Sequence, residues 1–215
     1  MRKREILEKI GAVELALFIT DSYKKKKDQA DELCGFVRDK ILSSSTTSVY
    51  KDQHSDLALV VHRGTKTMKD IGTDVAVAFG FARWTTRVRC ALVIQKIAAR
   101  KYGRKNVATI GHSLGGKIAE IVGVKGKLIL TYNKAVSFDS MFHSRNNQTD
   151  IRSRFDLVSG LGVFHQQVTI PSTLNPLEAH SVGPLEAHAT EANVLLRQQS
   201  SDSSELSSPG SIESE

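Results

Sequence analysis

The chain has 215 residues, of which 40% are hydrophobic and 25% charged, which is enough for one domain with a hydrophobic core and short for two. Its formal net charge is +7, and residues 1–197 carry +11 because the last eighteen residues contain four acidic side chains and no basic one. This charge favours phosphate-bearing or anionic-lipid partners. The lack of any apolar run of about 18 residues excludes a transmembrane helix.

The start of the chain has the basic residues of a secretory signal peptide but lacks its other parts. After residues 1–4, glutamates interrupt the apolar stretch, and a lysine run at 24–27 stands where a small-residue cleavage site would follow. Cys34 and Cys90 are too few for a disulfide framework, and reduced thiols are typical of an intracellular protein. We therefore expect a cytoplasmic protein without a signal peptide.

Apolar periodicity predicts two N-terminal helices, followed by alternating strands and helices. Apolar residues recur at three- and four-residue steps over about 4–20 and 28–43, which predicts helices packed on the core. Strands are predicted at 48–51, 56–62, 106–111, 127–132, 151–155 and 166–170, and further helices over 82–102, 115–123 and 177–198. Such alternation is typical of an α/β fold, a mainly parallel sheet with helices on both faces.

The composition changes near the end of the chain. Residues 1–198 are predicted to form a single domain that includes the N-terminal helices over 4–43. From residue 199 onward the chain is rich in serine and acidic residues, and such a segment buries too little apolar surface to fold. We therefore predict a disordered acidic tail over 199–215.

The sequence Gly111-His112-Ser113-Leu114-Gly115 joins a predicted strand to a predicted helix. This is the Gly-x-Ser-x-Gly nucleophile elbow in its expected context. The serine sits on a tight, strained turn with its hydroxyl held clear of the chain, and the flanking glycines leave room for the turn. We therefore predict Ser113 as a nucleophile, and we expect His112 to pack against the sheet or line the cleft.

A serine hydroxyl needs a histidine base and an acid that orients this base, and in this fold the chain order is Ser, then Asp or Glu, then His. Asp156 follows a predicted strand and starts an abrupt turn, so it shares the carboxyl edge of the sheet with Ser113. Asp150 comes at the start of that strand, on the other edge. We therefore predict Asp156 as the acid.

Four histidines follow Ser113 in the chain. His143 precedes the acid, and His165 lies only nine residues after it, so both are disfavoured. His180 and His188 end two copies of the sequence Pro-Leu-Glu-Ala-His, eight residues apart. We favour His180 as the base because it lies in a loop that leads into a helical pattern, and His188 stays the alternative.

Two N–H donors are needed where the reacting oxygen becomes negative. Leu114, directly after the nucleophile, supplies one, and the loop after the buried strand 56–62 supplies the other. In that loop Thr65 can donate through its N–H and its hydroxyl, and Gly64 lets the backbone approach. Arg63 is expected to anchor the loop, with Asp74 as its partner.

These residues resemble the class 3 lipase family, the fungal-lipase-like α/β-hydrolases. The resemblance rests on the apolar strand that runs into Arg63-Gly64-Thr65, on Asp74 nine residues on, on Gly-His-Ser-Leu-Gly-Gly at 111–116, and on Asp156-Leu157-Val158 after a strand. It spans roughly residues 48–182.

The resemblance implies an α/β-hydrolase-type fold with Ser113 as nucleophile, Asp156 as acid, the C-terminal histidine as base, and Thr65 and Leu114 as oxyanion hole. The implied substrates are carboxylic esters, often acylglycerols or phospholipids, and no metal or organic cofactor is implied. Three features depart from the family pattern. His62 replaces an aromatic residue, Tyr-Asn-Lys-Ala at 132–135 replaces Gly-x-Pro, and residues 66–73 are short and polar where the family has a lid helix.

The sequence therefore predicts an intracellular, lipase-like serine hydrolase that cleaves a carboxylic ester, such as that of a glycerolipid or phospholipid, through a Ser-His-Asp triad and an acyl-enzyme. The alternative is a catalytically weak or inactive hydrolase-fold module that binds a lipid or a protein. The basic surface is compatible with peripheral contact with an anionic membrane surface, and no nucleic-acid partner is expected.

Overall fold

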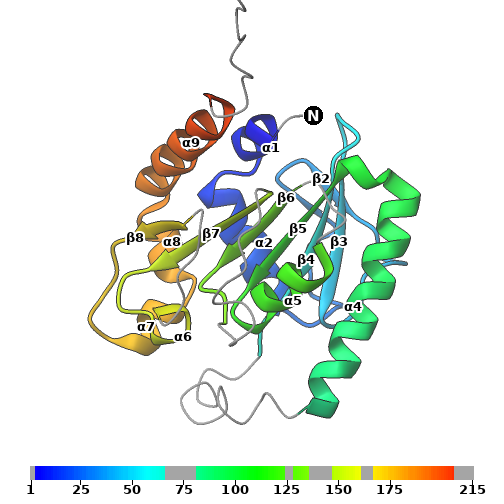
Figure 1. The fold of residues 1–215 in the computed structure, drawn as a ribbon. Helices are drawn as coiled ribbons and strands as arrows, with labels where there is room; N and C mark the ends of the chain where they lie inside the picture. Colours follow the sequence, from blue (N-terminus) through cyan, green and yellow to red (C-terminus); the bar gives the residue numbers. More distant parts are fainter. Residues whose placement is uncertain (1–2, 66–80, 124–127, 136–146, 161–166, 206–215) are drawn as a thin grey trace, which may run out of the picture.

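The computed structural model describes residues 3–65, 81–123, 128–135, 147–160 and 167–205, which form one sheet covered by helices (Figure 1). The strands of this part follow one another across the sheet in chain order: β1 (Glu32–Leu33), β2 (Phe36–Arg38), β3 (Thr47–Asp52), β4 (Ala58–His62), β5 (Val107–His112), β6 (Leu128–Tyr132), β7 (Gln148–Ser153) and β8 (Gln167–Ile170). The pairings from β1 to β4 are antiparallel. Those from β4 to β8 are parallel, which confirms the predicted α/β sheet.

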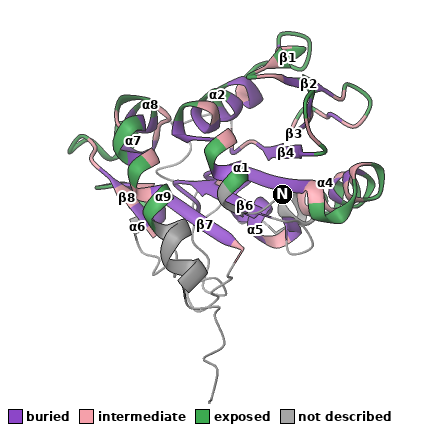
Figure 2. Cartoon of the chain, turned by 90° about the horizontal axis from the view of Figure 1, so that it is seen from above, coloured by how far each residue is buried: buried purple, intermediate pink, exposed green. Residues whose placement is uncertain are grey.

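Helices cover both faces of this sheet, as predicted. They are α1 (Lys3–Lys9), α2 (Ala12–Tyr23), α4 (Phe81–Tyr102), α5 (Leu114–Val122), α6 (Leu157–Gly160), α7 (Pro176–His180), α8 (Gly183–Ala187) and α9 (Ala189–Glu205), with a 3₁₀ turn, η2 (Arg104–Asn106), after α4. Figure 2 shows α1 and α2 on one side of the sheet and α4 and α5 on the other. Within the described ranges, no helix has the length and the hydropathy that crossing a membrane requires.

Strand β4 shows why the sheet needs helices on both sides. Leu59 and Val61 belong to the large core cluster that also contains residues of α1, α2 and α9. Val60 belongs instead to a smaller cluster with Ala98 of α4. Neighbouring residues of a strand point to opposite faces, so a strand with apolar residues at every position is stable only between two layers. Each buried Leu or Val contributes roughly 1.5–3 kcal/mol to this arrangement.

The helix predicted over 28–43 is wrong, because this segment forms β1, β2 and turns. Cys34 and Gly35 have φ values of 52° and 76°, which close the tight turn between the two antiparallel strands. In β2, Phe36 and Arg38 are buried and Val37 is exposed, which is a two-residue period and not a helical one. The N-terminal helices therefore end at residue 23 instead of residue 43.

The strand predicted over 151–155 is β7, which begins and ends earlier, so that Asp150 lies within it and Phe155 lies in a turn with a φ of 65°. Two predicted helices are divided where glycine or proline interrupts the periodicity. The helix predicted over 4–20 is divided at Gly11 into α1 and α2. The helix predicted over 177–198 is three helices, because Pro176 and Pro184 each lie in the first turn of a short one. α9 continues past the start of the predicted tail to Glu205, and residues 206–215 lie outside the described residues.

His62, at the end of β4, is a buried neutral side chain. Its Nδ1 lies 3.0 Å from Thr47 Oγ1, and its Nε2 has no hydrogen-bond partner among the described residues. Burial, with a smaller effect from the charge of Arg87, lowers its pKa from 6.5 to about 3. An imidazole in the unfolded chain keeps its ordinary pKa, so on acidification it binds a proton that the folded one does not.

The free energy of unfolding should therefore fall as the pH drops from about 6.5 toward about 3, by up to ~1.4 kcal/mol per pH unit for this histidine. In this window the unfolded state binds more protons than the folded state, so protons favour unfolding. His62→Phe should show a shallower pH dependence in urea denaturation. The same slope in both proteins would contradict this account.

Candidate active site

Ser113 lies on a sharp turn between β5 and α5. Its φ and ψ are 56° and −128°, a strained combination for a residue with a side chain. A Cβ added to Gly111 would lie 2.2 Å from the carbonyl oxygen of Gly115, and one added to Gly115 would lie 2.1 Å from that of His62. Only glycine fits at both positions, so the Gly-x-Ser-x-Gly pattern is a steric requirement of this turn.

The imidazole of His180 joins Ser113 to Asp156. Its Nε2 lies 2.9 Å from Ser113 Oγ, and its Nδ1 lies 2.8 Å from Asp156 Oδ1. An ionised carboxylate only accepts hydrogen bonds, so Nδ1 carries the hydrogen and Nε2 accepts from the serine hydroxyl. All three residues are exposed by 4% or less. The structure thus brings Ser113, Asp156 and His180 into one hydrogen-bonded line.

Asp156 is held in its ionised form. It follows β7 and accepts hydrogen bonds from the backbone N–H groups of Val158 (3.1 Å) and Ser159 (3.2 Å), and from the Ser159 hydroxyl. Burial acts to raise the pKa of Asp156, but hydrogen bonds from His180, Ser159 and the backbone leave that pKa below its usual value. A carboxylate in this state can orient the imidazole and stabilise its protonated form.

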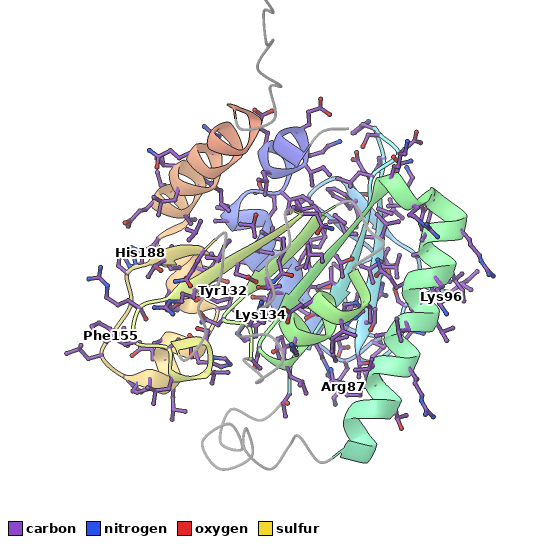
Figure 3. The ribbon with its side chains drawn as sticks, in the orientation of Figure 1. Arg87, Lys96, Tyr132, Lys134, Phe155 and His188 are labelled. Atoms are coloured by element: carbon purple, nitrogen blue, oxygen red, sulfur yellow. The ribbon has the colours of Figure 1, made fainter. Side chains whose placement is uncertain are left out.

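The other candidates lie elsewhere or outside the described residues. The side chain of His188 is 38% exposed and contacts a glutamate of α9, and Figure 3 shows it at the periphery of the molecule. Asp150 lies inside β7, where it pairs with Lys134 at 3.2 Å. His143 and His165 fall outside the described ranges. Within those ranges, no group of three or more His, Cys, Asp or Glu side chains could hold a metal ion.

Side chains at the ends of β5 and β6 hold the backbone of the histidine. Asn133 Nδ2, His112 Nε2 and Tyr132 Oη donate, in that order, to the three successive carbonyl oxygens of residues 179–181, over 2.9, 2.9 and 3.0 Å. Figure 3 shows Tyr132 in the middle of the molecule. Tyr132 and Asn133 were not predicted as site residues. Tyr132 ends the strand predicted over 127–132 and Asn133 follows it, and this position at the carboxyl end of a strand was the one signal that could have found them. They fix the peptide units on which the His180 imidazole depends.

His112 also connects this histidine segment to the loop after β4. Because its Nε2 donates to a carbonyl, its Nδ1 is bare and accepts from the hydroxyl of Tyr23 at 2.8 Å. The same hydroxyl accepts from the N–H of Gly64 at 3.0 Å. Burial, with a smaller effect from His180, lowers the pKa of His112 to about 3, so this ring stays neutral near neutral pH. No sequence motif indicated that Tyr23 contacts the site.

The Arg63-Gly64-Thr65 loop lies directly against the elbow. A Cβ added to Gly64 would lie 2.9 Å from the Cβ of Ser113, so the loop backbone passes beside the hydroxyl. Thr65 is half-buried, and Leu114 opens α5, where N–H groups lack intrahelical partners. Arg87 of α4, labelled in Figure 3, donates to the carbonyl oxygen of Arg63 at 2.7 Å. The predicted partner Asp74 and the segment 66–73 lie outside the described residues.

Tyr132→Phe should slow the reaction of Ser113 with a fluorophosphonate probe by roughly tenfold, because about 1.4 kcal/mol of positioning energy would be lost with the bond to the segment 179–181. The phenyl ring would keep its stacking on His112, whose ring centre lies 5.5 Å away. The rate of labelling, followed by in-gel fluorescence, measures this effect.

Tyr50→Phe is the matched control. It also removes a buried hydroxyl, one that donates to Asp21 at 2.6 Å. It should lower stability and leave the labelling rate unchanged. Equal labelling of the wild type and Tyr132→Phe would mean that this bond does not position the histidine.

Comparison with solved structures finds matches that extend over most of the chain. The chain is similar to the Lip2 lipase from Yarrowia lipolytica, with a TM-score of 0.53 and 16% identity over 77% of this chain and 81% of that one. It is also similar to a triacylglycerol lipase from Penicillium expansum, with a TM-score of 0.46 and 15% identity over 78% of each chain. No family model and no curated protein matches the sequence. The similarity to Lip2 shows that the chain has a lipase-like α/β-hydrolase fold, as the sequence resemblance implied.

Proposed function

We propose that the protein is a serine hydrolase that cleaves carboxylic esters through an acyl-enzyme on Ser113. The observation that supports this function is the line of two hydrogen bonds, 2.9 and 2.8 Å long, that runs from Ser113 through His180 to Asp156. A serine, a base and an acid in this relation form the arrangement that activates a hydroxyl for acyl transfer.

In the first half of the reaction, His180 Nε2 takes the proton of Ser113 Oγ while this oxygen attacks the carbonyl carbon of the ester. The C=O π bond opens, and its oxygen becomes an oxyanion. When the carbonyl re-forms, the bond to the alcohol breaks, and the protonated imidazole gives its proton to the leaving alkoxide. In the second half, His180 Nε2 takes a proton from a water molecule while the water oxygen attacks the carbonyl carbon of the acyl-enzyme. The bond between this carbon and Ser113 Oγ then breaks, the imidazole returns the proton to Oγ, and the carboxylic acid leaves.

The oxyanion would accept hydrogen bonds from the N–H of Leu114 and from the N–H or hydroxyl of Thr65. Leu114 is the first residue of α5, and the loop that carries Thr65 passes beside the nucleophile. Donors that are already in place need no reorganisation during the reaction, and each typically contributes about 2.7–4 kcal/mol to transition-state stabilisation.

Exposed apolar side chains on the segments that carry the acid and the base favour a lipid ester as substrate. Phe155 and Leu157 flank the acid and are 49% and 69% exposed, and Figure 3 shows Phe155 at the surface. Leu174 and Leu177 precede the base and are 79% and 49% exposed. Such side chains can contact the acyl chains of a glycerolipid or phospholipid. The Lip2 protein with a similar fold is itself a lipase.

The wild-type chain should be labelled by a fluorophosphonate probe, and Ser113→Ala should abolish the labelling because the reacting oxygen is gone. Asp156→Asn should slow the labelling by roughly 10⁴-fold, because the amide favours the wrong tautomer of the imidazole. In-gel fluorescence of the folded proteins measures both effects.

The two histidines provide a matched pair of variants. His180→Ala should lose turnover of a short-chain nitrophenyl ester, and His188→Ala should keep it, because only the first removes the base. Turnover that survives in His180→Ala would contradict the assigned base. A folded wild-type protein that is neither labelled nor active would instead support the non-catalytic binding module.

A further inference from the structure

The chain around α4 contains basic residues and no acidic ones. Between Asp74 and Glu120 there is no aspartate or glutamate, whereas residues 75–119 include nine lysines and arginines. Two of the basic residues on α4 already have structural roles, since Arg87 binds the loop after β4 and Lys101 pairs with Asp39 at 2.7 Å. Lys117 is buried and pairs with Glu120 at 2.9 Å, whereas Arg89, Lys96, Arg100, Arg104 and Lys105 are exposed.

One face of α4 combines these cations with apolar side chains. Arg89, Val93, Lys96, Ile97 and Arg100 recur at the three- and four-residue steps of one helix face, and all five are exposed. Val93 is 56% and Ile97 40% exposed. Figure 3 shows Lys96 on the outer side of the helix. This face is therefore both basic and apolar.

A recess of about 260 Å³ lies between α4 and α5, next to this face. Its apolar lining includes Leu92, Ile121 and Val122, and its cations are Lys96, Arg100 and Arg104. Within the described part of the chain, none of these three cations has an ion-pair partner, so their charge is available to an anion.

Gln95 adds an unused polar group to the recess. This buried side chain lines the recess, and its Nε2 donates to Thr109 Oγ1 at 2.9 Å. Its Oε1 is buried without a hydrogen-bond partner among the described residues. A buried acceptor without a partner is costly, and a shift of this side chain toward the recess would let it accept from a hydroxyl or ammonium hydrogen.

We propose that the recess and the exposed face of α4 bind the surface of a phospholipid membrane, with the phosphate of an anionic head group held by Lys96, Arg100 and Arg104. Cations bind the phosphate and the surrounding negative surface, while Val93 and Ile97 enter the interface between head groups and acyl chains. The phosphates of a nucleic acid would use the cations but gain nothing from the aliphatic side chains. The proposal does not depend on hydrolase activity, because the recess lies at the end of α5 that is remote from Ser113.

Co-sedimentation with vesicles tests this site, with the full-length Ser113→Ala protein so that no lipid is hydrolysed. The protein should bind vesicles of phosphatidylcholine with added phosphatidylglycerol, and not vesicles of phosphatidylcholine alone. Lys96→Gln with Arg100→Gln should weaken this binding by roughly 30-fold, at about 1 kcal/mol per basic side chain near the membrane. An unchanged thermal unfolding midpoint would show that this variant remains folded.

Lys25→Gln with Lys27→Gln is the control, because it removes the same charge from the exposed lysine run after α2. It should weaken binding by no more than a few-fold. Equal losses in the two double variants would mean that net charge alone drives binding, and this result would overturn the site. Absence of binding to the anionic vesicles would overturn it as well.

A second variant separates a membrane from a nucleic acid. Val93→Ser with Ile97→Ser should weaken vesicle binding by roughly tenfold, because the apolar contact with the membrane is lost. The contradicting result has two parts. The apolar variant would bind vesicles as well as the wild type does, and the Lys96→Gln, Arg100→Gln variant would bind duplex DNA more weakly. This result would assign the surface to nucleic acid.

Discussion

The position of the His180 imidazole is the constraint on which the rest of the site depends. Its two hydrogen bonds reach in opposite directions, and a displacement of about 1 Å can cost a reaction of this kind roughly 10²-fold. The helix that carries it, α7, has five residues and is too short to be stable alone. Tertiary contacts must therefore hold α7 in position. The hydrogen bonds to the carbonyl oxygens of residues 179–181 are such contacts.

The end of β6 fixes the nucleophile as well as the base. The N–H of Ser113 donates to the carbonyl oxygen of Tyr132 at 3.2 Å, and the carbonyl oxygen of Ser113 accepts from Ala135 at 3.1 Å and from Gly116 at 2.9 Å. A residue in this strained conformation costs of the order of 1–3 kcal/mol. The hydrogen bonds, each contributing about 0.5–1.5 kcal/mol, offset that cost. Because Tyr132 holds the serine by its backbone and the histidine segment by its hydroxyl, β6 sets the distance between the two.

The parts of the fold that could be predicted from the sequence are those fixed by local sterics and by the hydrophobic pattern. The apolar run at 56–62 predicted a buried strand, and the glycines around Ser113 predicted a tight turn that leads into a helix. The structure has the strand, the turn and the helix at these positions. The segment 28–43 was assigned wrongly because a few apolar residues fit a helical period by chance, while the tight turn at Cys34 decides the structure.

The tertiary contacts of the site could not be predicted in the same way. His180 and His188 end identical five-residue sequences, and only the packing of α7 against the strand ends buries His180 while His188 stays half-buried. Likewise, no pattern indicates that Tyr23 reaches His112, which is 89 residues away in the chain. These contacts depend on the complete fold.

A direct test of the central claim is to mix the wild-type chain with a nitrophenyl ester, quench the reaction with acid, and map the product by peptide mass spectrometry. The account predicts a mass increase equal to one acyl group on the peptide that contains Ser113, and its loss when the quench is delayed until the ester is consumed. An acyl group found only on other residues, or ester cleavage without an adduct on Ser113 at any time, would contradict it.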